Sequence, residues 1–168
     1  MNERQKFALT VLLNYEGEPI EASIVGNEHF RDAQRRGDEE LVRKLRLRSS
    51  NIGWGRTLLW LNDRDFARRE FRESSATYRY EITEQGRQAL HDALGSPFWR
   101  ATVNRGGGDR PRWLRAATML EARRVAERSA WPASVTGVRG PLTEQDFRNA
   151  VGIPEDAPLH DPWWEEEL

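Results

Sequence analysis

Apolar residues in the first sixty positions recur at the spacing of amphipathic helices. The stretches 4–14, 39–47 and 53–61 each carry hydrophobic side chains at intervals of three or four residues, the period of a helix with one buried face. Residues 20–36 contain apolar side chains at a similar spacing, but Gly26 interrupts them, so the structure of this stretch stays open. The beginning of the chain is therefore predicted to be mainly helical.

The stretch 53–61 is the most informative of these predicted helices. Its buried face is expected to consist of residues at positions i, i+4 and i+7, namely Trp54, Leu58 and Leu61. Its opposite face combines small, polar and aromatic residues, namely Gly53, Arg56, Thr57 and Trp60. Residues 49–51 are Ser, Ser and Asn, each of which can cap the start of the helix. The opposite face is a surface for a binding partner, although a place in the core is the alternative for Trp60.

After this helix the hydrophobic period changes from helical to alternating. Residues 78–82 alternate apolar with charged side chains, which predicts a half-buried strand, and residues 67–72 are the candidate partner strand. The two sides of the partner strand are Ala67, Arg69 and Phe71 on one, and Arg68, Glu70 and Arg72 on the other. The polar residues 73–77 have the length of a hairpin loop. A β-hairpin is therefore predicted over 67–82, with continuation of the preceding helix through 65–71 as the alternative.

The second half of the chain is predicted to be helical around a glycine-rich stretch. Thr83 is the expected cap of a helix that ends at Gly95. Residues 96–110 include three consecutive glycines and are expected to form a linker or loop. Pro111 suits the first turn of a helix over 111–129, and residues 143–151 predict a last short helix.

These elements predict a fold class that is mainly α with a small β-hairpin. We expect a first domain over 1–95, the linker or loop over 96–110, and a helical extension over 111–168. The extension ends in an acidic tail with two tryptophans, residues 161–168.

The distribution of charge says more than the formal net charge of −1. Residues 41–80 carry ten Arg or Lys against four Asp or Glu, a balance of +6, whereas both ends of the chain are acidic. A basic segment of this kind indicates a surface that binds a polyanion, and pairing of opposite charges within the molecule is the alternative. Nearly all the basic residues are Arg, which holds phosphate or guanine in a bidentate fashion, but a GC-rich genome produces the same bias.

Residues for catalysis or metal binding are not recognisable in the sequence. The chain has no cysteine, and its histidines, His29, His91 and His160, are far apart and lack metal-ligand spacing. The glycines 106–108 are not followed by the Lys-Ser/Thr of a phosphate loop, and no nucleophile elbow is present. We therefore expect a protein that is not an enzyme and holds no cofactor or metal.

The absence of cysteine also favours a reducing compartment. The apolar run 7–13 is too short to span a bilayer and lacks a small-residue cleavage site. These features lead us to expect a cytoplasmic protein without a membrane partner.

The predicted order of elements and one short motif resemble a known class of regulators. Residues 78–87 read Tyr-Arg-Tyr-Glu-Ile-Thr-Glu-Gln-Gly-Arg, which resembles the second wing strand and the T-E-x-G-R helix start of winged helix-turn-helix proteins of the MarR and PadR kind. The resemblance is strongest over 61–94 and extends loosely over 1–95. It implies a winged helix-turn-helix followed by a helical C-terminal extension.

The same resemblance implies a DNA-binding protein, specifically a transcriptional regulator. It places helix 53–61 in the major groove of double-stranded DNA and the 67–82 hairpin on the backbone or in the minor groove. The implied contacts to base edges come from Arg56, Thr57 and Trp60. The implied contacts of the hairpin come from Arg68, Arg69, Arg72 and Arg79, and those of the preceding segment include Arg46 and Arg48.

A second hypothesis is a bacterial or phage protein that uses a winged-helix scaffold for assembly and does not bind DNA. In that case a protein partner would contact Trp60 or the tail 161–168. Under either hypothesis, residues 111–129 are a candidate surface for a homodimer.

Overall fold

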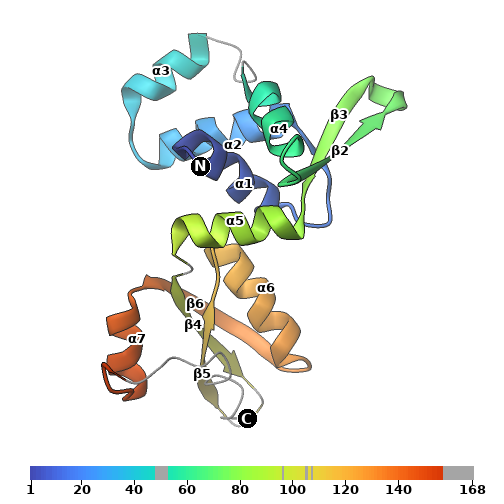
Figure 1. Cartoon of the computed structure of the whole chain (residues 1–168). Helices are drawn as coiled ribbons and strands as arrows, with labels where there is room; N and C mark the ends of the chain where they lie inside the picture. Colours follow the sequence, from blue (N-terminus) through green and yellow to red (C-terminus); the bar gives the residue numbers. More distant parts are fainter. Residues whose placement is uncertain (48–52, 96, 105, 107, 157–168) are drawn as a thin grey trace. The chain divides into compact units, whose positions relative to one another are not determined.

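The computed structural model describes residues 1–47, 53–95, 97–104, 106 and 108–156 of the 168-residue chain. These residues belong to two compact units, Met1–Ala93 and Leu94–Leu168 (Figure 1). The first unit is built from α1 (Glu3–Asn14), β1 (Ile20–Glu21), α2 (Ala22–Arg35), α3 (Glu39–Leu47), α4 (Trp54–Asn62), β2 (Ala67–Arg72), the 3-10 turn η1 (Glu73–Ser75), β3 (Thr77–Ile82) and α5 (Glu84–Leu94). The second is built from β4 (Phe98–Asn104), β5 (Asp109–Arg115), α6 (Met119–Ala130), β6 (Ser134–Leu142) and α7 (Glu144–Val151).

The helices of the first unit bury the apolar stripes that their sequences contain. A capping box starts α1, in which the backbone N–H of Gln5 donates to the Asn2 side chain and the N–H of Asn2 donates to the Gln5 side chain, both at 2.9 Å. The fully buried side chains of this unit include Leu9, Leu12, Leu13, Val25, Leu58, Leu61 and Leu90. Because burying one such side chain contributes about 1.5–3 kcal/mol, this cluster holds α1, α2, α4 and α5 together.

The first sheet has the antiparallel strand order β1-β3-β2. Ile20 pairs with Tyr80, and Ala67 pairs with Ile82, and all four residues are buried where the sheet meets the helices. Beyond these pairs, β2 and β3 continue as a hairpin that projects away from the helices of its unit (Figure 1). The base of the hairpin is therefore part of the core, and its outer part is surface.

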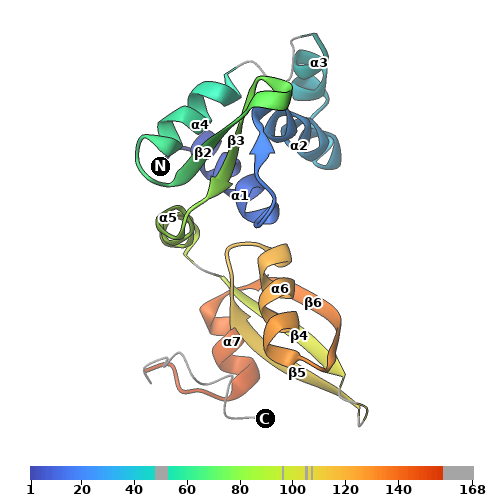
Figure 2. The ribbon, with the colours of Figure 1, turned by 90° about the vertical axis from the view of Figure 1, so that its right-hand side faces the viewer.

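The second sheet has the order β5-β4-β6, and both outer strands are antiparallel to β4. Helix α6 lies across one face of this sheet (Figure 2). Trp99, Ala101 and Leu114 of the sheet pack there against Ala122 and Ala126 of the helix. The small alanines allow the helix to approach the sheet closely, and the large indole fills the remaining space.

Helix α7 joins the same unit through an aromatic contact. The ring of Phe147 stacks on that of Phe98, with centroids 4.3 Å apart, and Trp113 contacts Phe147 edge-on at 5.4 Å. Thr143 caps the helix, because its side chain accepts a hydrogen bond from the N–H of Asp146 at 3.1 Å. The last helix predicted from the sequence is thereby confirmed.

The predicted fold class, a mainly α winged helix-turn-helix with one small hairpin and a helical C-terminal extension, is wrong. The described residues form two three-stranded antiparallel sheets besides the helices, and the second half of the chain contains three strands. In the first half, the two-residue strand β1 adds a third strand to the hairpin. Such a short strand leaves no periodic signal in the sequence, so only its partner could be predicted.

The expected linker over 96–110 and the expected helix over 111–129 are also corrected. Residues 98–104 form β4, and Pro111 lies inside β5 rather than at the start of a helix. A proline is tolerated in β5 because this is an edge strand, where its missing N–H can face away from the neighbouring strand. Helix α6 begins only at Met119, with Thr118 as its cap.

The other helix and hairpin predictions of the first unit are confirmed. Helices α1, α3 and α4 and the β2–β3 hairpin agree with the predicted stretches to within a residue or two. The stretch 20–36, left open by the sequence, is a short strand followed by a helix that runs through the buried Gly26. The cap candidates 49–51 lie outside the described residues. Among the described helices, none has both the length and the apolar character needed to cross a membrane.

Candidate nucleic-acid interface

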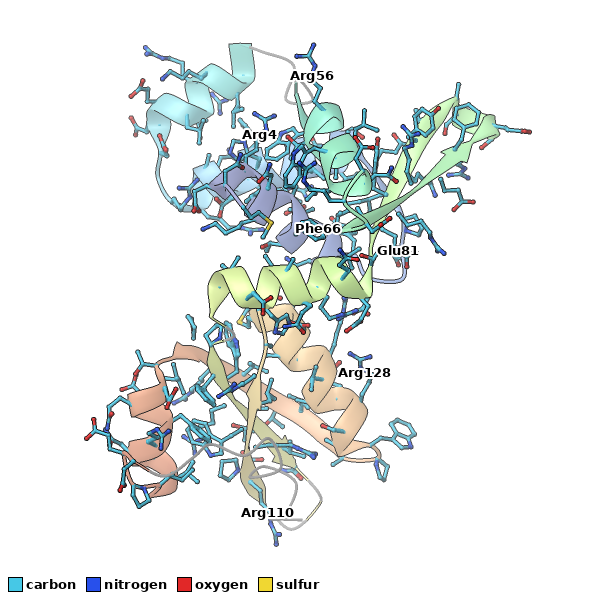
Figure 3. All side chains as sticks on the ribbon, viewed as in Figure 1. Arg4, Arg56, Phe66, Glu81, Arg110 and Arg128 are labelled. Atoms are coloured by element: carbon cyan, nitrogen blue, oxygen red, sulfur yellow. The ribbon has the colours of Figure 1, made fainter. Side chains whose placement is uncertain are left out.

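Helix α4 is anchored by one face and presents the other to solvent. Its anchoring side chains are Trp54, Leu58 and Leu61, each at most 2% exposed, as the spacing predicted. Arg56 is exposed and points away from the other helices of its unit (Figure 3). No ion pair joins Arg56 to any residue that the structure describes, so its guanidinium is available to a partner.

Thr57 is less available, because Arg4 of α1 holds it. The Arg4 Nε–H donates to Thr57 Oγ1 at 3.1 Å, and the Thr57 hydroxyl donates to the carbonyl of Gly53 at 3.2 Å. The same guanidinium lies 4.2 Å above the ring of Trp54. Thr57 keeps its methyl group and one lone pair for a partner, while its hydroxyl fixes α4 to α1.

Trp60 is half-buried on α4. The sequence left open whether its side chain faces outward or lies in the core, and its actual position is intermediate. The guanidinium of Arg64 lies 3.9 Å above the Trp60 ring, and Phe66 contacts this ring edge-on at 6.2 Å. The indole is therefore packed on one side and partly exposed on the other. A cation seated on this ring adds positive charge next to the exposed side of α4.

The hairpin has two chemically different faces, because side chains alternate along β2 and β3. The first face, called here the paired face, consists of Arg68, Glu70, Arg72, Thr77, Arg79 and Glu81. Opposite charges stand next to each other on it: Arg68 pairs with Glu81 at 2.9 Å, and Arg79 lies opposite Glu70 and beside Glu21 of β1. Much of the basic charge predicted for the hairpin is therefore balanced on this face.

The second face, called here the aromatic face, carries Arg69, Phe71 and Tyr78 beyond the buried Tyr80. The Arg69 guanidinium lies 4.5 Å from the centroid of the Tyr78 ring, and the rings of Phe71 and Tyr78 are 5.2 Å apart. Phe71 is 51% exposed and Tyr78 is 46% exposed. No carboxylate belongs to this face of the hairpin, so its cation and rings are open to a partner.

Tyr80, the buried residue at the base of the aromatic face, lies where strand β2 contacts α4. Burial raises the pKa of Tyr80, and the charge and hydrogen bond of Arg69 oppose this shift. Asp63, at the end of α4, also acts to raise the pKa of Tyr80. Asp63 is thus the acidic group that faces this side of the unit, where Arg64 and Arg69 carry the opposite charge.

The remaining predicted site residues are spread over other parts of the unit. Arg46 is exposed on α3, and Arg48 lies outside the described residues. Arg72 is exposed where β2 ends. Arg79 is half-buried beside β1, and its Nε has no hydrogen-bond partner among the described residues. Arg56 and Trp60 therefore belong to α4, Arg69 lies on the aromatic face of the neighbouring strand β2, and Arg79 is on the opposite, paired face of the hairpin.

Three residues of this surface were missed by sequence reasoning, namely Leu59, Arg64 and Phe71. Leu59 is 38% exposed on the outward side of α4. Phase within the helix could have identified it, because Leu59 is three residues after Arg56 and both lie opposite the buried face. The position of Arg64 over Trp60 has no such signal, because it depends on the turn that follows α4.

Metal-binding geometry is not found in the described part of the chain. No three acidic, histidine or cysteine side chains among the described residues come together as metal ligands. His29 packs against the rings of Phe7 and Trp54, with both centroids 5.2 Å away, and these two rings also contact each other at 5.7 Å. Burial lowers the pKa of His29, which favours its neutral form.

Comparisons with known proteins do not assign this chain to a class. No protein-family model, curated protein or solved structure matches it. The surface formed by α4 and the aromatic face remains its most distinctive chemical feature, with exposed guanidinium groups next to aromatic rings. Such a surface is suited to phosphates and nucleobases.

Proposed function

We propose that the first unit binds double-stranded DNA. In this proposal the outward side of α4 enters the major groove, and the β2–β3 hairpin lies against the backbone or in the minor groove. The observation that carries it is the pair of exposed cations Arg56 and Arg69, which stand on adjacent elements and form no ion pair with a described residue. Phosphates and guanine edges are the natural partners of such guanidinium groups.

The dimensions of the surface support this proposal. With nine residues, α4 is about 14 Å long at 1.5 Å per residue. An α-helix with its side chains is about 10–12 Å across, so α4 fits the major groove of B-DNA, which is about 12 Å wide. Arg56 lies in its first turn, and base contacts in helix-turn-helix complexes come from the start of the recognition helix.

The balance of +6 over residues 41–80 supports binding to a polyanion independently of the geometry. A transcriptional regulator is the role that the sequence resemblance implies for such a protein, and the absence of cysteine favours the cytoplasm as its location. A regulatory role requires more than DNA binding, because a regulator also prefers one DNA sequence. Detection of a preferred sequence would therefore support this role.

The proposal is tested by fluorescence anisotropy of a labelled duplex with the full chain, at about 50 and about 200 mM salt. A protein that contacts several phosphates should lose affinity by orders of magnitude across this range. Arg56→Ala should weaken binding to a selected sequence by about 1–3 kcal/mol and relax the base preference. Arg31→Ala is the matched control, because Arg31 is equally exposed but is paired with Glu28 on α2. Absence of binding at about 50 mM salt would exclude the proposal.

The second candidate function is protein assembly, and one observation favours it. Leu59 and the half-buried Trp60 together give α4 an apolar outward patch beside Arg56. The acidic tail 161–168, the other expected contact with a protein, lies outside the described residues. A homodimer through residues 111–129 stays a prediction, and in this stretch Met119 and Leu120 expose 58% and 40% of their surface.

A further inference from the structure

The aromatic face carries two rings that the core of the first unit does not use. Phe71 and Tyr78 are directly opposite each other on β2 and β3, and about half of each side chain is exposed. The residues at the base of the same face, Tyr80 and Ile82, are at most 8% exposed. The core therefore ends below the pair, and the two rings extend the aromatic face into solvent. The hairpin that carries them projects from the helices of its unit (Figure 1).

The chemistry around the rings selects the kind of partner. Arg69 places its guanidinium against Tyr78, and Tyr78 in turn contacts Phe71, which is the more exposed of the two rings. An apolar protein surface would leave this guanidinium without a counter-charge. A nucleotide satisfies both groups, because its base can stack on the open ring while its phosphate approaches the cation.

The base that stacks on Phe71 cannot be part of an intact duplex. Inside a duplex both faces of each base are covered by its neighbours, and a ring reaches a base face only where a base is unstacked. A hairpin beside a groove-bound helix is well placed to meet such a base where the duplex ends or opens.

We propose that Phe71 stacks on an unpaired base next to the duplex, with Tyr78 and Arg69 supporting it. The DNA bound by this protein would then be a duplex with a single-stranded extension or opening. This inference rests on the proposed function, since it requires the first unit to bind the adjoining duplex.

The test compares a blunt duplex, the same duplex with a short single-stranded extension, and the single strand alone, all at about 50 mM salt. The extension carries 2-aminopurine, whose fluorescence falls on stacking, at its first unpaired position. We expect the full chain to bind the extended duplex about tenfold more tightly than the blunt one, and to quench the probe. Phe71→Leu should remove both effects, so that this variant binds the extended and the blunt duplex with equal affinity, whereas Phe71→Trp should keep them.

Trp131→Leu is the control for loss of an exposed aromatic ring, because Trp131 is 83% exposed in the second unit. The inference would be overturned if the wild type and Phe71→Leu both bound the two duplexes with the same affinity. Binding to duplex DNA would still stand in that case, and the two rings would be available for a protein partner. An equal loss for both duplexes in Phe71→Leu would also overturn it, since Phe71 would then be a general contact. A single strand bound as tightly as the extended duplex, with quenching that needs Phe71, would support stacking and overturn the proposed function. Binding of none of the three DNAs would overturn both.

Discussion

At the scale of single residues, His29 links the stability of the first unit to pH. Its ring packs against those of Phe7 and Trp54, and burial together with the nearby charge of Arg4 lowers its pKa. Asp32 and Arg36 also face it, with opposing effects. The folded state therefore favours the neutral imidazole more strongly than the unfolded chain does, where the pKa is about 6.5.

The consequence of this lowered pKa is destabilisation by mild acid. As the pH falls below about 6.5, the unfolded chain takes up a proton at His29 before the folded protein does, so the free energy of unfolding decreases until the folded pKa is passed. His29→Phe keeps an aromatic ring against Phe7 and Trp54 and removes the titrating group. Urea unfolding at pH 7.5 and pH 5.5 should show a smaller loss of stability for the variant. Equal losses would mean that His29 does not contribute to the pH dependence.

At the scale of elements, the start of α5 is fixed to the turn before β2 by close backbone contact. An ideal Cβ at Gly86 would lie 1.9 Å from the carbonyl oxygen of Phe66. Thr83 holds the same turn, because its N–H donates to the Phe66 carbonyl at 3.2 Å and its hydroxyl donates to the carbonyl of Asp65. The helix can approach the hairpin in this way only because residue 86 has no side chain.

Two Gly→Ala substitutions separate this contact from helix propensity. Gly86→Ala should destabilise the protein by more than about 2 kcal/mol, because the new methyl group displaces backbone. Gly55→Ala in α4 should stabilise it by up to about 1 kcal/mol, since a Cβ at Gly55 meets open space. Thermal or urea unfolding of both variants gives the comparison. Shifts of the same sign in the two variants would contradict the contact at Phe66.

Elements with a clean period could be predicted from the sequence, and those without one could not. Helix α4 and strand β3 have one buried and one exposed face, so their periods of 3.6 and 2 are visible. Strand β4 is partly covered on both faces, by α6 at Trp99 and by α7 at Phe98. Its buried residues Trp99, Ala101 and Val103 alternate with less buried ones, but Phe98 is also buried and breaks this alternation at the start of the strand. Glycines follow the strand, and they led to its interpretation as a linker.

In the candidate site, the direction of individual side chains could be predicted from the sequence, but their long-range contacts could not. The outward position of Arg56 and the two sides of β2 follow from local periodicity. The ion pair of Arg68 with Glu81 needs the register of the hairpin, and the half-burial of Arg79 needs strand β1. These contacts join residues far apart in the sequence, so a local pattern does not encode them.

At the scale of the whole molecule, the net charge of −1 conceals where positive charge is available. Arg68 and Arg69 are neighbours in sequence and carry the same charge, yet only Arg68 has a carboxylate partner at 2.9 Å. A cation that is already paired releases fewer counterions when it meets a phosphate. Substitution of each of the two arginines therefore distinguishes which face of the hairpin contacts DNA.

If the aromatic face contacts DNA, Arg69→Ala should lower the slope of log affinity against log salt by about one unit. Arg68→Ala should change the slope by clearly less, although it removes the same formal charge. Titrations of a blunt duplex at four or five salt concentrations provide the two slopes. A larger effect of Arg68→Ala would assign the DNA contact to the paired face instead.

Both outer strands of the second sheet contain a proline, Pro111 in β5 and Pro141 in β6. A proline offers no N–H to an incoming strand, so neither border of this sheet is a good template for strand addition by another chain. The second unit is thereby protected against aggregation through its backbone. A dimer that uses this unit would have to form by packing of side chains, and the apolar groups exposed for it include Met119 and Leu120 of α6 and Trp131.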